Sequence, residues 1–392
     1  MASPYPPSAA STIGPRPSFR EKVNRFWLRV TEGLALNQLW SQFQKDARAS
    51  YQLYAKDLDK DLDAARADTT RPGRKALYVA QQFFWAVLEK LTPARRVLLL
   101  LALVLLIFNP EVSWHSQGDL HVISFDFRLY GGLLIFLLLI AEVGDKVVMK
   151  RDLQIAREIQ TWLLPNEPPV IPGIQIAFQT RPANTVAGDY YDVFARPGTA
   201  DGRVLLTVAD VAGKSIPAAM LMATFQASLR TLAVTTSSLS ELVTSINHYA
   251  CTNSQGGLRF TTAFLGELDP ASRTLTYINA GHNAPMLIRS SGALERLEAG
   301  GLPIGIQADT AYQPGSVVLA PGDWLVIFTD GVVEAFNPRG DEYGEPRLLA
   351  TIATGASTTP ADMMRRIMTD LDVFVGNTPQ HDDMTCLLLK VA

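Results

Sequence analysis

Cysteine and histidine are scarce in this sequence: its 392 residues include two cysteines and five histidines. Cys251 and Cys386 stand far apart and show no CxxC spacing, so they offer neither a zinc site nor a redox pair. We expect both to be reduced thiols in a cytosolic compartment. The formal net charge of −3 provides no excess of basic residues for the phosphates of nucleic acid. We therefore predict that nucleic acid is not a partner.

A secretory signal is also missing, because the first 19 residues are rich in Pro, Ser and Ala and carry no apolar run behind a basic start. We interpret this stretch as a disordered tail. Hydrophobic residues make up 47% of the chain, more than a soluble enzyme requires, so the excess should lie in particular segments. A length of 392 residues suggests two or three structural units.

Two apolar runs in the first half of the chain carry this excess, Val97–Phe108 and Leu129–Val143. Each is shorter than the ~20 residues of an ideal membrane span, so helices buried in a soluble core are the alternative. Basic residues such as Arg95 and Lys146 flank the pair on both outer sides, whereas the stretch between the runs holds a single Arg. By the positive-inside rule this arrangement predicts a two-helix transmembrane hairpin over residues 94–143, with both ends in the cytoplasm.

The region before the hairpin, residues 1–93, contains another helical pattern. Apolar residues recur at helical spacing between Leu36 and Ala65, and Pro72-Gly73 ends the pattern. One interpretation is a helix that packs or dimerises, and the alternative is a sensor element with its own ligand. Side chains typical of a ligand site are not evident in this segment.

After the hairpin, residues 144–168 are predicted to form a helical linker that Pro165 ends. Apolar residues repeat along it at heptad-like spacing, which is typical of a helix that packs against a partner surface. They are Val148, Ile155, Ile159 and Trp162. The partner is either the rest of the same chain or the same helix of a second subunit in a homodimer. The linker is accordingly either a passive tether or a relay between membrane and enzyme.

From Ile174 onward the pattern changes to short β-type runs separated by turns and by helical segments. The runs are IQIAFQT, VLLTVAD, TAFLGEL, TLTYINA, WLVIFTD and MTCLLLKV. They come in neighbouring pairs rather than alternating with helices, which favours antiparallel sheets covered by helices over a doubly wound parallel sheet. We therefore predict an α+β domain with two sheets over residues 169–392.

Acidic residues stand at the ends of several of these segments. They are Asp189, Asp210, Asp330, Asp382 and Asp383. A turn or a helix cap explains any one of them taken alone. Two apolar strands, however, run straight into Asp210 and Asp330, and a carboxylate at a buried strand end needs a countercharge. Oxygen ligands without His or Cys suit Mg²⁺ or Mn²⁺ better than zinc, so we predict a divalent-metal site.

Eight sequence blocks follow one another from about Leu153 to the end of the chain, the first of them beginning at Arg151. They are RDLQIAREIQTWLLP, AGDYYDVF, ADVAGKSIPAAM, RFTTAFLGELD, NAGHNAPMLI, LPIGI, PGDWLVIFTDGVVEA and HDDMTCLLL. Together they resemble the SpoIIE/RsbU branch of the PPM (type 2C) metal-dependent protein phosphatases. The resemblance implies an α-β-β-α sandwich and a protein-serine/threonine phosphatase. With the hairpin, it implies a multi-pass protein of the bacterial inner membrane whose catalytic domain is cytoplasmic.

The resemblance also implies a site for two Mn²⁺ or Mg²⁺ ions that activate a water molecule for attack on phosphorus, so that no phospho-enzyme is needed. Asp210 would bridge the two ions. The implied metal ligands are Asp189, Asp210, the Val211 carbonyl, Asp330, Asp382 and Asp383. The predicted catalytic residues are Asp189, Asp210, Asp330 and Asp382.

The sequence departs from the family pattern at a few positions. Ala187 and Ser215 stand where many members have glycine, and Ala212 replaces a His proposed as general acid in eukaryotic relatives. These changes remove no ligand, so we expect activity to survive, with leaving-group protonation from water or another group. Lys214 either offsets local negative charge or is solvated. We interpret His282 as structural, because hydrogen bonding within a turn explains a His between Gly and Asn.

Three functions compete: an active phosphoprotein phosphatase, an inactive scaffold and a hydrolase of small phosphate esters. Retention of all four predicted catalytic aspartates argues against the scaffold. The resemblance points to partner-switching signalling, in which the substrate is a phosphoserine or phosphothreonine on a STAS-domain anti-sigma-factor antagonist. The predicted partners are therefore this phosphoprotein and the membrane.

Overall fold

The computed structural model describes residues 81, 84, 85, 88–108, 126–198, 202–253, 259–355 and 357–392. The tail and the amphipathic helix predicted before residue 73 lie outside these residues. The chain divides into two compact units, Met1–Val143 and Gly144–Ala392. Helix α4 (Pro93–Phe108) belongs to the first unit, and helix α5 (Phe127–Leu163) begins in the first and ends in the second.

In the first unit, α4 packs antiparallel against the beginning of α5. Gly131 permits a close approach, because a Cβ at this position would lie 2.8 Å from the carbonyl oxygen of Ala102. At the other end of the pair, Nη1 of Arg95 lies 3.1 Å from the Glu142 carboxylate. The two apolar runs of the sequence are therefore helical and paired, and many of their Leu, Ile and Val side chains are exposed.

Across the described ranges, no helix is both long enough and apolar enough to cross a membrane. Helix α4 has 16 residues, fewer than the ~20 that a span requires. Helix α5 has 37 residues, but charged side chains interrupt it from Glu142 onward. The transmembrane hairpin predicted over residues 94–143 is therefore not found here. The segment between the two helices lies outside the described residues.

The second unit contains two β-sheets. The first has the order β1 (Ile174–Arg181), β11 (Met384–Val391), β10 (Trp324–Phe328), β6 (Met286–Ile288) and β7 (Leu294–Arg296). The second has the order β2 (Tyr190–Ala195), β3 (Val204–Val211), β4 (Thr261–Asp269), β5 (Thr274–Ala280) and β8 (Gly300–Gly301), and β9 (Gly315–Val318) also pairs with β5. Neighbours are antiparallel except β5 and β8. All six β-type runs of the sequence are strands.

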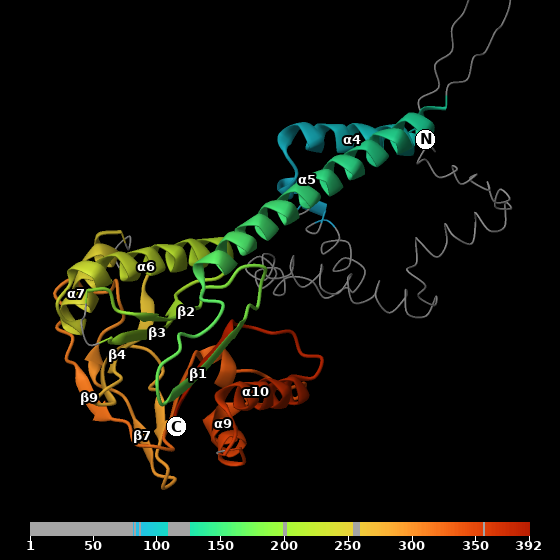
Figure 1. The fold of residues 1–392 in the computed structure, drawn as a ribbon. Coiled ribbons are helices and arrows are strands. Elements are labelled where there is room, and N and C mark those ends of the chain that lie inside the picture. Colours follow the sequence, from blue (N-terminus) through green and yellow to red (C-terminus); the bar gives the residue numbers. More distant parts are fainter. Residues whose placement is uncertain are drawn as a thin grey trace, which may run out of the picture. The chain divides into compact units, whose positions relative to one another are not determined.

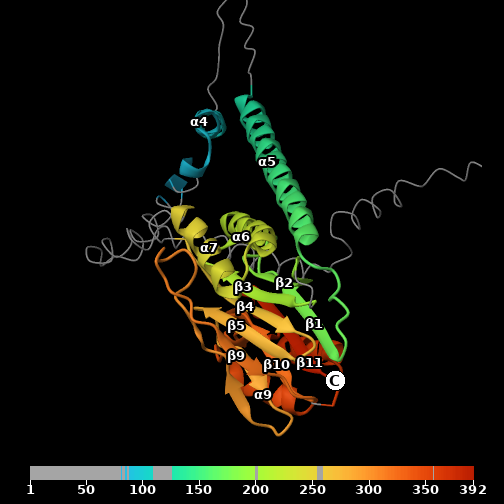
Figure 2. The same ribbon diagram turned by 60° about the vertical axis from the view of Figure 1, so that its left-hand side comes forward.

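Helices cover the outer face of each sheet, as the two views of Figures 1 and 2 show. Helices α6 (Ser215–Thr235) and α7 (Leu239–Asn253) pack on the second sheet. Helices α9 (Gly344–Ala353) and α10 (Pro360–Val375) pack on the first, after the single turn α8 (Asp330–Val333). A third apolar cluster fills the space between the sheets. This arrangement confirms the predicted α-β-β-α sandwich.

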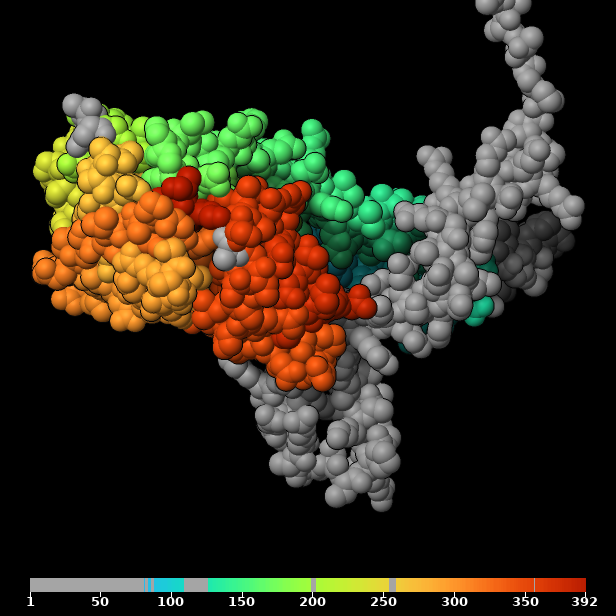
Figure 3. Space-filling model, turned by 60° about the horizontal axis from the view of Figure 1, so that its bottom comes forward, coloured from blue at the N-terminus to red at the C-terminus, as the bar shows by residue number. Residues whose placement is uncertain are grey.

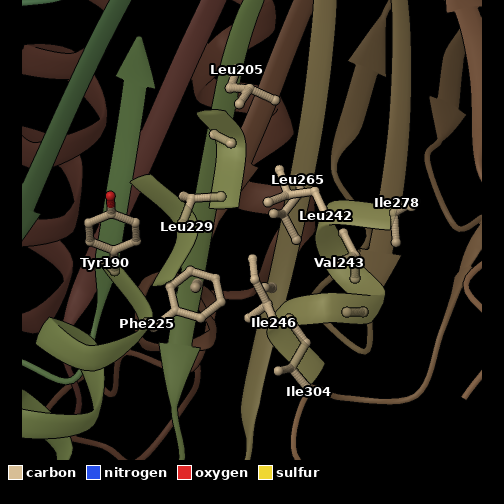
Figure 4. Close-up of a cluster of buried hydrophobic side chains, with 14 of the residues drawn as sticks. Tyr190, Leu205, Phe225, Leu229, Leu242, Val243, Ile246, Leu265, Ile278 and Ile304 are labelled. Carbon is tan, nitrogen blue, oxygen red and sulfur yellow. The ribbon is translucent and has the colours of Figure 1, made fainter. Parts of the chain in front are cut away.

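The core under α6 and α7 follows from the helical period of the sequence. Buried side chains of α6 recur every three or four residues, at Ala218, Met222, Phe225, Leu229 and Ala233. Figure 4 shows Phe225 and Leu229 together with Tyr190 and Leu265 of the sheet. A single apolar face thus fixes α6 above the strands that end at the acidic residues.

Strand pairing also joins segments that are distant in sequence. β1 pairs with β11 along its whole length, from Ile174 opposite Val391 to Arg181 opposite Met384. In the space-filling view of Figure 3, red atoms from the end of the chain lie against green atoms from much earlier in the sequence. The C-terminal acidic residues are thereby brought beside the loop that precedes β2.

Candidate metal and active site

The register of the strands brings the predicted acidic residues together. β2 begins where β3 ends, so Asp189 and Asp210 stand at neighbouring strand ends. β11 begins where β10 ends, so Asp330 and Asp382 are neighbours in the other sheet. The two pairs lie close enough together for the charges of Asp330 and Asp382 to raise the pKa of Asp210. One carboxylate-rich site therefore forms at the shared end of the two sheets.

Two glycines allow the site's segments to approach closely. A Cβ at Gly331 would overlap the carbonyl oxygen of Asp383, so a larger residue does not fit after Asp330. A Cβ at Gly188 would lie 3.3 Å from the Val211 carbonyl oxygen. The predicted ligand oxygen of Val211 therefore lies against the loop that carries Asp189.

Burial and like charge both destabilise the ionised carboxylates. Burial raises the pKa of Asp189 well above its ordinary value, and the charge of Asp210 adds to this. The pKa of Asp210 is raised to about 7, first by burial and then by Asp330 and Asp382. Burial, followed by the Asp382 charge, also raises the pKa of Asp330. A cluster of this kind favours a proton or a metal cation among its oxygens.

Thr329 holds the buried carboxylate of Asp189. Its hydroxyl Oγ1 donates to Oδ2 of Asp189 at 2.9 Å and accepts from the backbone N–H of Thr385 at 2.9 Å. The Asp189 carboxylate is the nearest acceptor to this hydroxyl, ahead of the carbonyl oxygens of Asp383 at 3.3 Å and Thr385 at 3.5 Å. Sequence analysis missed Thr329, although it directly precedes Asp330.

Asp383 serves the loop that leads to Asp189. Its Oδ1 accepts from the backbone N–H of Ala183 at 2.7 Å, and its Oδ2 accepts from that of Gly188 at 2.6 Å. The residue is 8% exposed. Asp383 thus shapes the loop around the site, and the ligand role that the resemblance implies for it stays a prediction.

Lys214 offsets charge at the site, as one of its two interpretations proposed. Its Nζ lies 2.9 Å from Oδ2 of Asp382 and donates to the carbonyl oxygen of His381 at 2.8 Å. The hydrogen bond to Asp382 raises the pKa of Lys214. A cleft of about 270 Å³ opens beside this pair, and Phe336 and His381 are among its lining residues.

The donor chemistry of the site fits a hard divalent cation, because every candidate ligand is a carboxylate or carbonyl oxygen. Within the part of the chain that the structure describes, no three His, Cys, Asp or Glu side chains lie close enough together to hold one ion. The Asp382 carboxylate is paired with Lys214, and the Asp383 carboxylate accepts hydrogen bonds from two backbone amides. The residues that would hold Mg²⁺ or Mn²⁺ are Asp189, Asp210, Asp330, Asp382 and the Val211 carbonyl.

A buried ion pair ties α6 to the strand that follows Asp189. Asp192 is fully buried and accepts two hydrogen bonds from Arg230, at 2.7 and 2.8 Å, and one from the Tyr190 hydroxyl. The Arg230 guanidinium also lies 3.9 Å from the ring centroid of Phe194. Loss of Arg230 would leave the buried Asp192 carboxylate without its cation, which is destabilising, although the 42% exposure of Arg230 screens part of the attraction. Sequence analysis did not identify this pair.

His282 has the structural position that its sequence context indicates. Its backbone N–H donates to the side-chain oxygen of Asn279 at 2.7 Å, and Nδ1 lies 3.2 Å from the Thr262 hydroxyl. Burial lowers the pKa of the imidazole to about 4. His282 is therefore neutral at physiological pH and stabilises the turn after β5.

Comparison with known proteins shows where this chain has relatives. Residues 200–392 match the family described as Stage II sporulation protein E (SpoIIE). The chain is similar to Protein IcfG from Synechocystis sp., with 27% identity over 64% of this chain and 43% of that protein. It is also similar to Phosphoserine phosphatase RsbU from Bacillus subtilis, with 28% identity over 63% of this chain and 72% of that protein. The chain thus spans less than half the length of IcfG.

Among solved structures, the fold is similar to the SiaA-PP2C domain of Pseudomonas aeruginosa. The TM-score is 0.56 at 21% sequence identity, and the match covers 63% of this chain and 99% of that domain. This likeness supports the PPM-type sandwich.

Proposed function

From the match of residues 200–392 to the SpoIIE family, we propose that the protein is a metal-dependent phosphoserine/phosphothreonine protein phosphatase. The observation that carries the proposal is the meeting of four aspartates from both sheets, Asp189, Asp210, Asp330 and Asp382. Uncompensated carboxylates destabilise a fold. A protein that served only as a scaffold would therefore gain nothing from bringing these four carboxylates together.

Two Mn²⁺ or Mg²⁺ ions bound by these residues would supply Lewis acidity and an activated water molecule. The chain itself positions the donors. Thr329 orients the Asp189 carboxylate, and Asp383 holds the backbone of the preceding loop. Lys214 offers a positive charge beside Asp382, at the mouth of the cleft where a phosphoryl group would enter. Ala212 supplies no proton, so the leaving group takes its proton from water or from another residue.

The proposed substrate is a phosphorylated STAS-domain anti-sigma-factor antagonist in a partner-switching pathway. The similarity to RsbU, a phosphoserine phosphatase, supports a phosphoprotein over a small phosphate ester. The site also supports this, because the exposed Lys214 and its partner Asp382 line a cleft at the surface of the domain.

We also propose attachment to the bacterial inner membrane through residues 94–143, with the phosphatase domain in the cytoplasm. The exposed apolar side chains of α4 and early α5 and the basic residues on their outer flanks support this. A cysteine introduced at Gln117 should react with an impermeant reagent from the periplasmic side. Reaction from the cytoplasmic side alone would exclude the hairpin.

A homodimer is proposed for the exposed stripe on α5. Ile155, Ile159 and Trp162 are 45%, 48% and 79% exposed, so the described part of one chain leaves much of this apolar face uncovered. The same helix of a second subunit would bury it.

One experiment separates the competing functions. Purified protein with Mn²⁺ is incubated with a phosphorylated STAS-domain antagonist and, in parallel, with a panel of small phosphate esters. We expect release of phosphate from the phosphoprotein that chelation with EDTA abolishes. Equal or faster hydrolysis of the small esters would favour an ester hydrolase, and no hydrolysis of either would favour a scaffold.

A further inference from the structure

A single glutamine near the end of α5 differs from its surroundings on the helix. Its neighbours Glu158, Ile159 and Thr161 are exposed, whereas Gln160 is 7% exposed. A buried amide must satisfy its hydrogen bonds within the protein, because its desolvation is otherwise uncompensated. The partners of Gln160 therefore indicate what this side chain does.

Both partners belong to one residue of the metal-site loop. Nε2 of Gln160 donates to the carbonyl oxygen of Ala187 at 2.7 Å. Oε1 of Gln160 accepts from the backbone N–H of Ala187 at 2.9 Å. The side-chain amide thus pairs with the main chain as a neighbouring strand would. Ala187 stands two residues before Asp189.

The following residues of the loop are held in the same way by other segments. Gly188 donates its N–H to Asp383, and the Asp189 carboxylate accepts from Thr329. Each of three consecutive residues therefore has its own anchor, from α5, from the residue before β11 and from the residue after β10. Only the anchor on α5 lies outside the strands and turns of the sandwich.

The loop has little room for movement on its other side. A Cβ on Gly188 would lie 3.2 Å from the Cβ of Ala218 on α6 and 3.3 Å from the Val211 carbonyl oxygen. The backbone is thus confined between α6 and β3 on one side and the Gln160 amide on the other. Loss of the amide would remove the contact that holds Ala187 on the side away from α6 and β3.

From these contacts we infer that Gln160 is a positioning residue for Asp189. It fixes the main chain at Ala187 so that the Asp189 carboxylate faces Asp210 and Thr329. The inference rests on the proposed function, since it concerns divalent-metal binding at that site. A purely structural role would stabilise the attachment of α5 without altering the affinity of the site for metal.

The test uses the full-length protein and Mn²⁺ as the probe. Gln160→Met keeps the length of the side chain and removes both hydrogen bonds. Gln154→Met makes the same chemical change at an exposed position of the same helix and serves as the matched control. Binding of Mn²⁺ without substrate is measured by isothermal titration, and kcat is measured at saturating Mn²⁺. Amide hydrogen exchange is followed over residues 183–189.

We expect Gln160→Met to weaken Mn²⁺ binding by about 10-fold or more, as loss of outer-shell partners does at other metal sites. Exchange at residues 183–189 should become faster, and kcat at saturating Mn²⁺ should fall by a smaller factor than the Mn²⁺ affinity. Gln154→Met should match the wild type. Gln160→Glu can still accept from the Ala187 N–H but cannot donate to its carbonyl. Its Mn²⁺ affinity should therefore be lower than that of the wild type.

Unchanged Mn²⁺ affinity in Gln160→Met, with an active wild type, would overturn the inference and leave the proposed function standing. If Gln160→Met does not fold, the decision passes to Gln160→Glu, and wild-type affinity there would overturn it. A wild-type protein that neither binds Mn²⁺ nor releases phosphate would overturn the proposed function, and this inference with it.

Discussion

The hydroxyl of Thr329 donates a 2.9 Å hydrogen bond to the carboxylate of Asp189, a residue 140 positions earlier in the chain. Thr329 is fully buried at the end of β10, and Asp189 is 2% exposed at the beginning of β2. This bond therefore crosses from one sheet to the other. It defines the orientation of a predicted metal ligand from a residue that has no ligand role itself.

Replacing Thr329 by valine should weaken metal binding. Valine keeps the shape of the side chain but removes the donor to Asp189 and the acceptor for the Thr385 N–H. We expect the Kd for Mn²⁺ to rise by about 10-fold, measured by titration calorimetry. Thr329→Ser retains the hydroxyl and should recover most of the affinity. Equal affinities for the valine and serine variants would contradict this role.

Substituting Asp210 or Asp330 by asparagine should remove nearly all turnover. Asparagine has the same shape but lacks the charge that holds a divalent ion. We expect kcat to fall by more than about 100-fold, beyond what loss of an outer-shell partner costs. The circular dichroism spectrum should be unchanged, and Asp309→Asn on an exposed loop is the control. A variant with the wild-type rate at saturating Mn²⁺ would exclude that residue as a ligand.

Without metal, the protein should become less stable as pH rises. Asp210 has an ordinary pKa of 3.8 and a folded-state pKa of about 7, and the pKa of Asp189 is raised as well. The folded state therefore binds protons more tightly than the unfolded state, so this stabilisation is complete below pH ~4 and lost by pH ~7.

Thermal unfolding in EDTA between pH 4.5 and pH 7.5 measures this effect. We expect Tm to fall by on the order of 5 °C over this range, as a change of about 2 kcal/mol would produce in a domain of this size. The fall should be smaller in Asp210→Asn. Saturating Mn²⁺ should reverse it, because the ion binds the ionised carboxylates. A Tm in EDTA that rises with pH would contradict the assigned shifts.

The backbone at Ser215 should be relieved by glycine. Ser215 has φ of 63°, in the left-handed region where side chains other than glycine cost about 1–2 kcal/mol. We expect Ser215→Gly to raise the free energy of unfolding by about 1 kcal/mol, measured by urea denaturation. Ser245→Gly within α7 is the matched control and should lower it by about 0.5–1 kcal/mol. Equal shifts in both variants would contradict local strain at Ser215.

The exposed stripe on α5 should influence activity if the helix is a relay. Ile159 and Trp162 are replaced together by glutamine, with Glu158→Gln as a polar control on the same helix. We expect basal phosphatase activity to change severalfold and the sedimentation of a dimer to shift to that of a monomer. Unchanged activity and mass would indicate a passive tether.

Much of this protein follows from local pattern in the sequence. Strands such as Trp324–Phe328 are apolar throughout because both of their faces are buried, and α6 shows an apolar residue every third or fourth position because one face is buried. These periods require no knowledge of partners. They sufficed to predict six strands, the covering helices and the end of α5 before Pro165.

The acidic residues of the site were also visible in sequence, because they recur at the ends of several segments and two apolar strands run straight into Asp210 and Asp330. The different roles of these residues were not visible in sequence. Asp382 and Asp383 are adjacent and identical, yet the first pairs with Lys214 and the second holds two backbone amides of a distant loop. Only the pairing of β1 with β11 brings that loop to Asp383.

The anchors Gln160 and Thr329 and the ion pair of Asp192 with Arg230 depend on tertiary structure for the same reason. A glutamine, a threonine or an aspartate has the same local signal whether it is solvated or buried, and its partner lies between 27 and 140 residues away. Over the described residues the two apolar runs fold as paired helices, and neither helix is both long enough and apolar enough to cross a membrane. Sequence thus determined the elements and the acidic donors. The packing of distant segments decided which side chain orients which donor, because burial and hydrogen-bond geometry exist only once those segments meet.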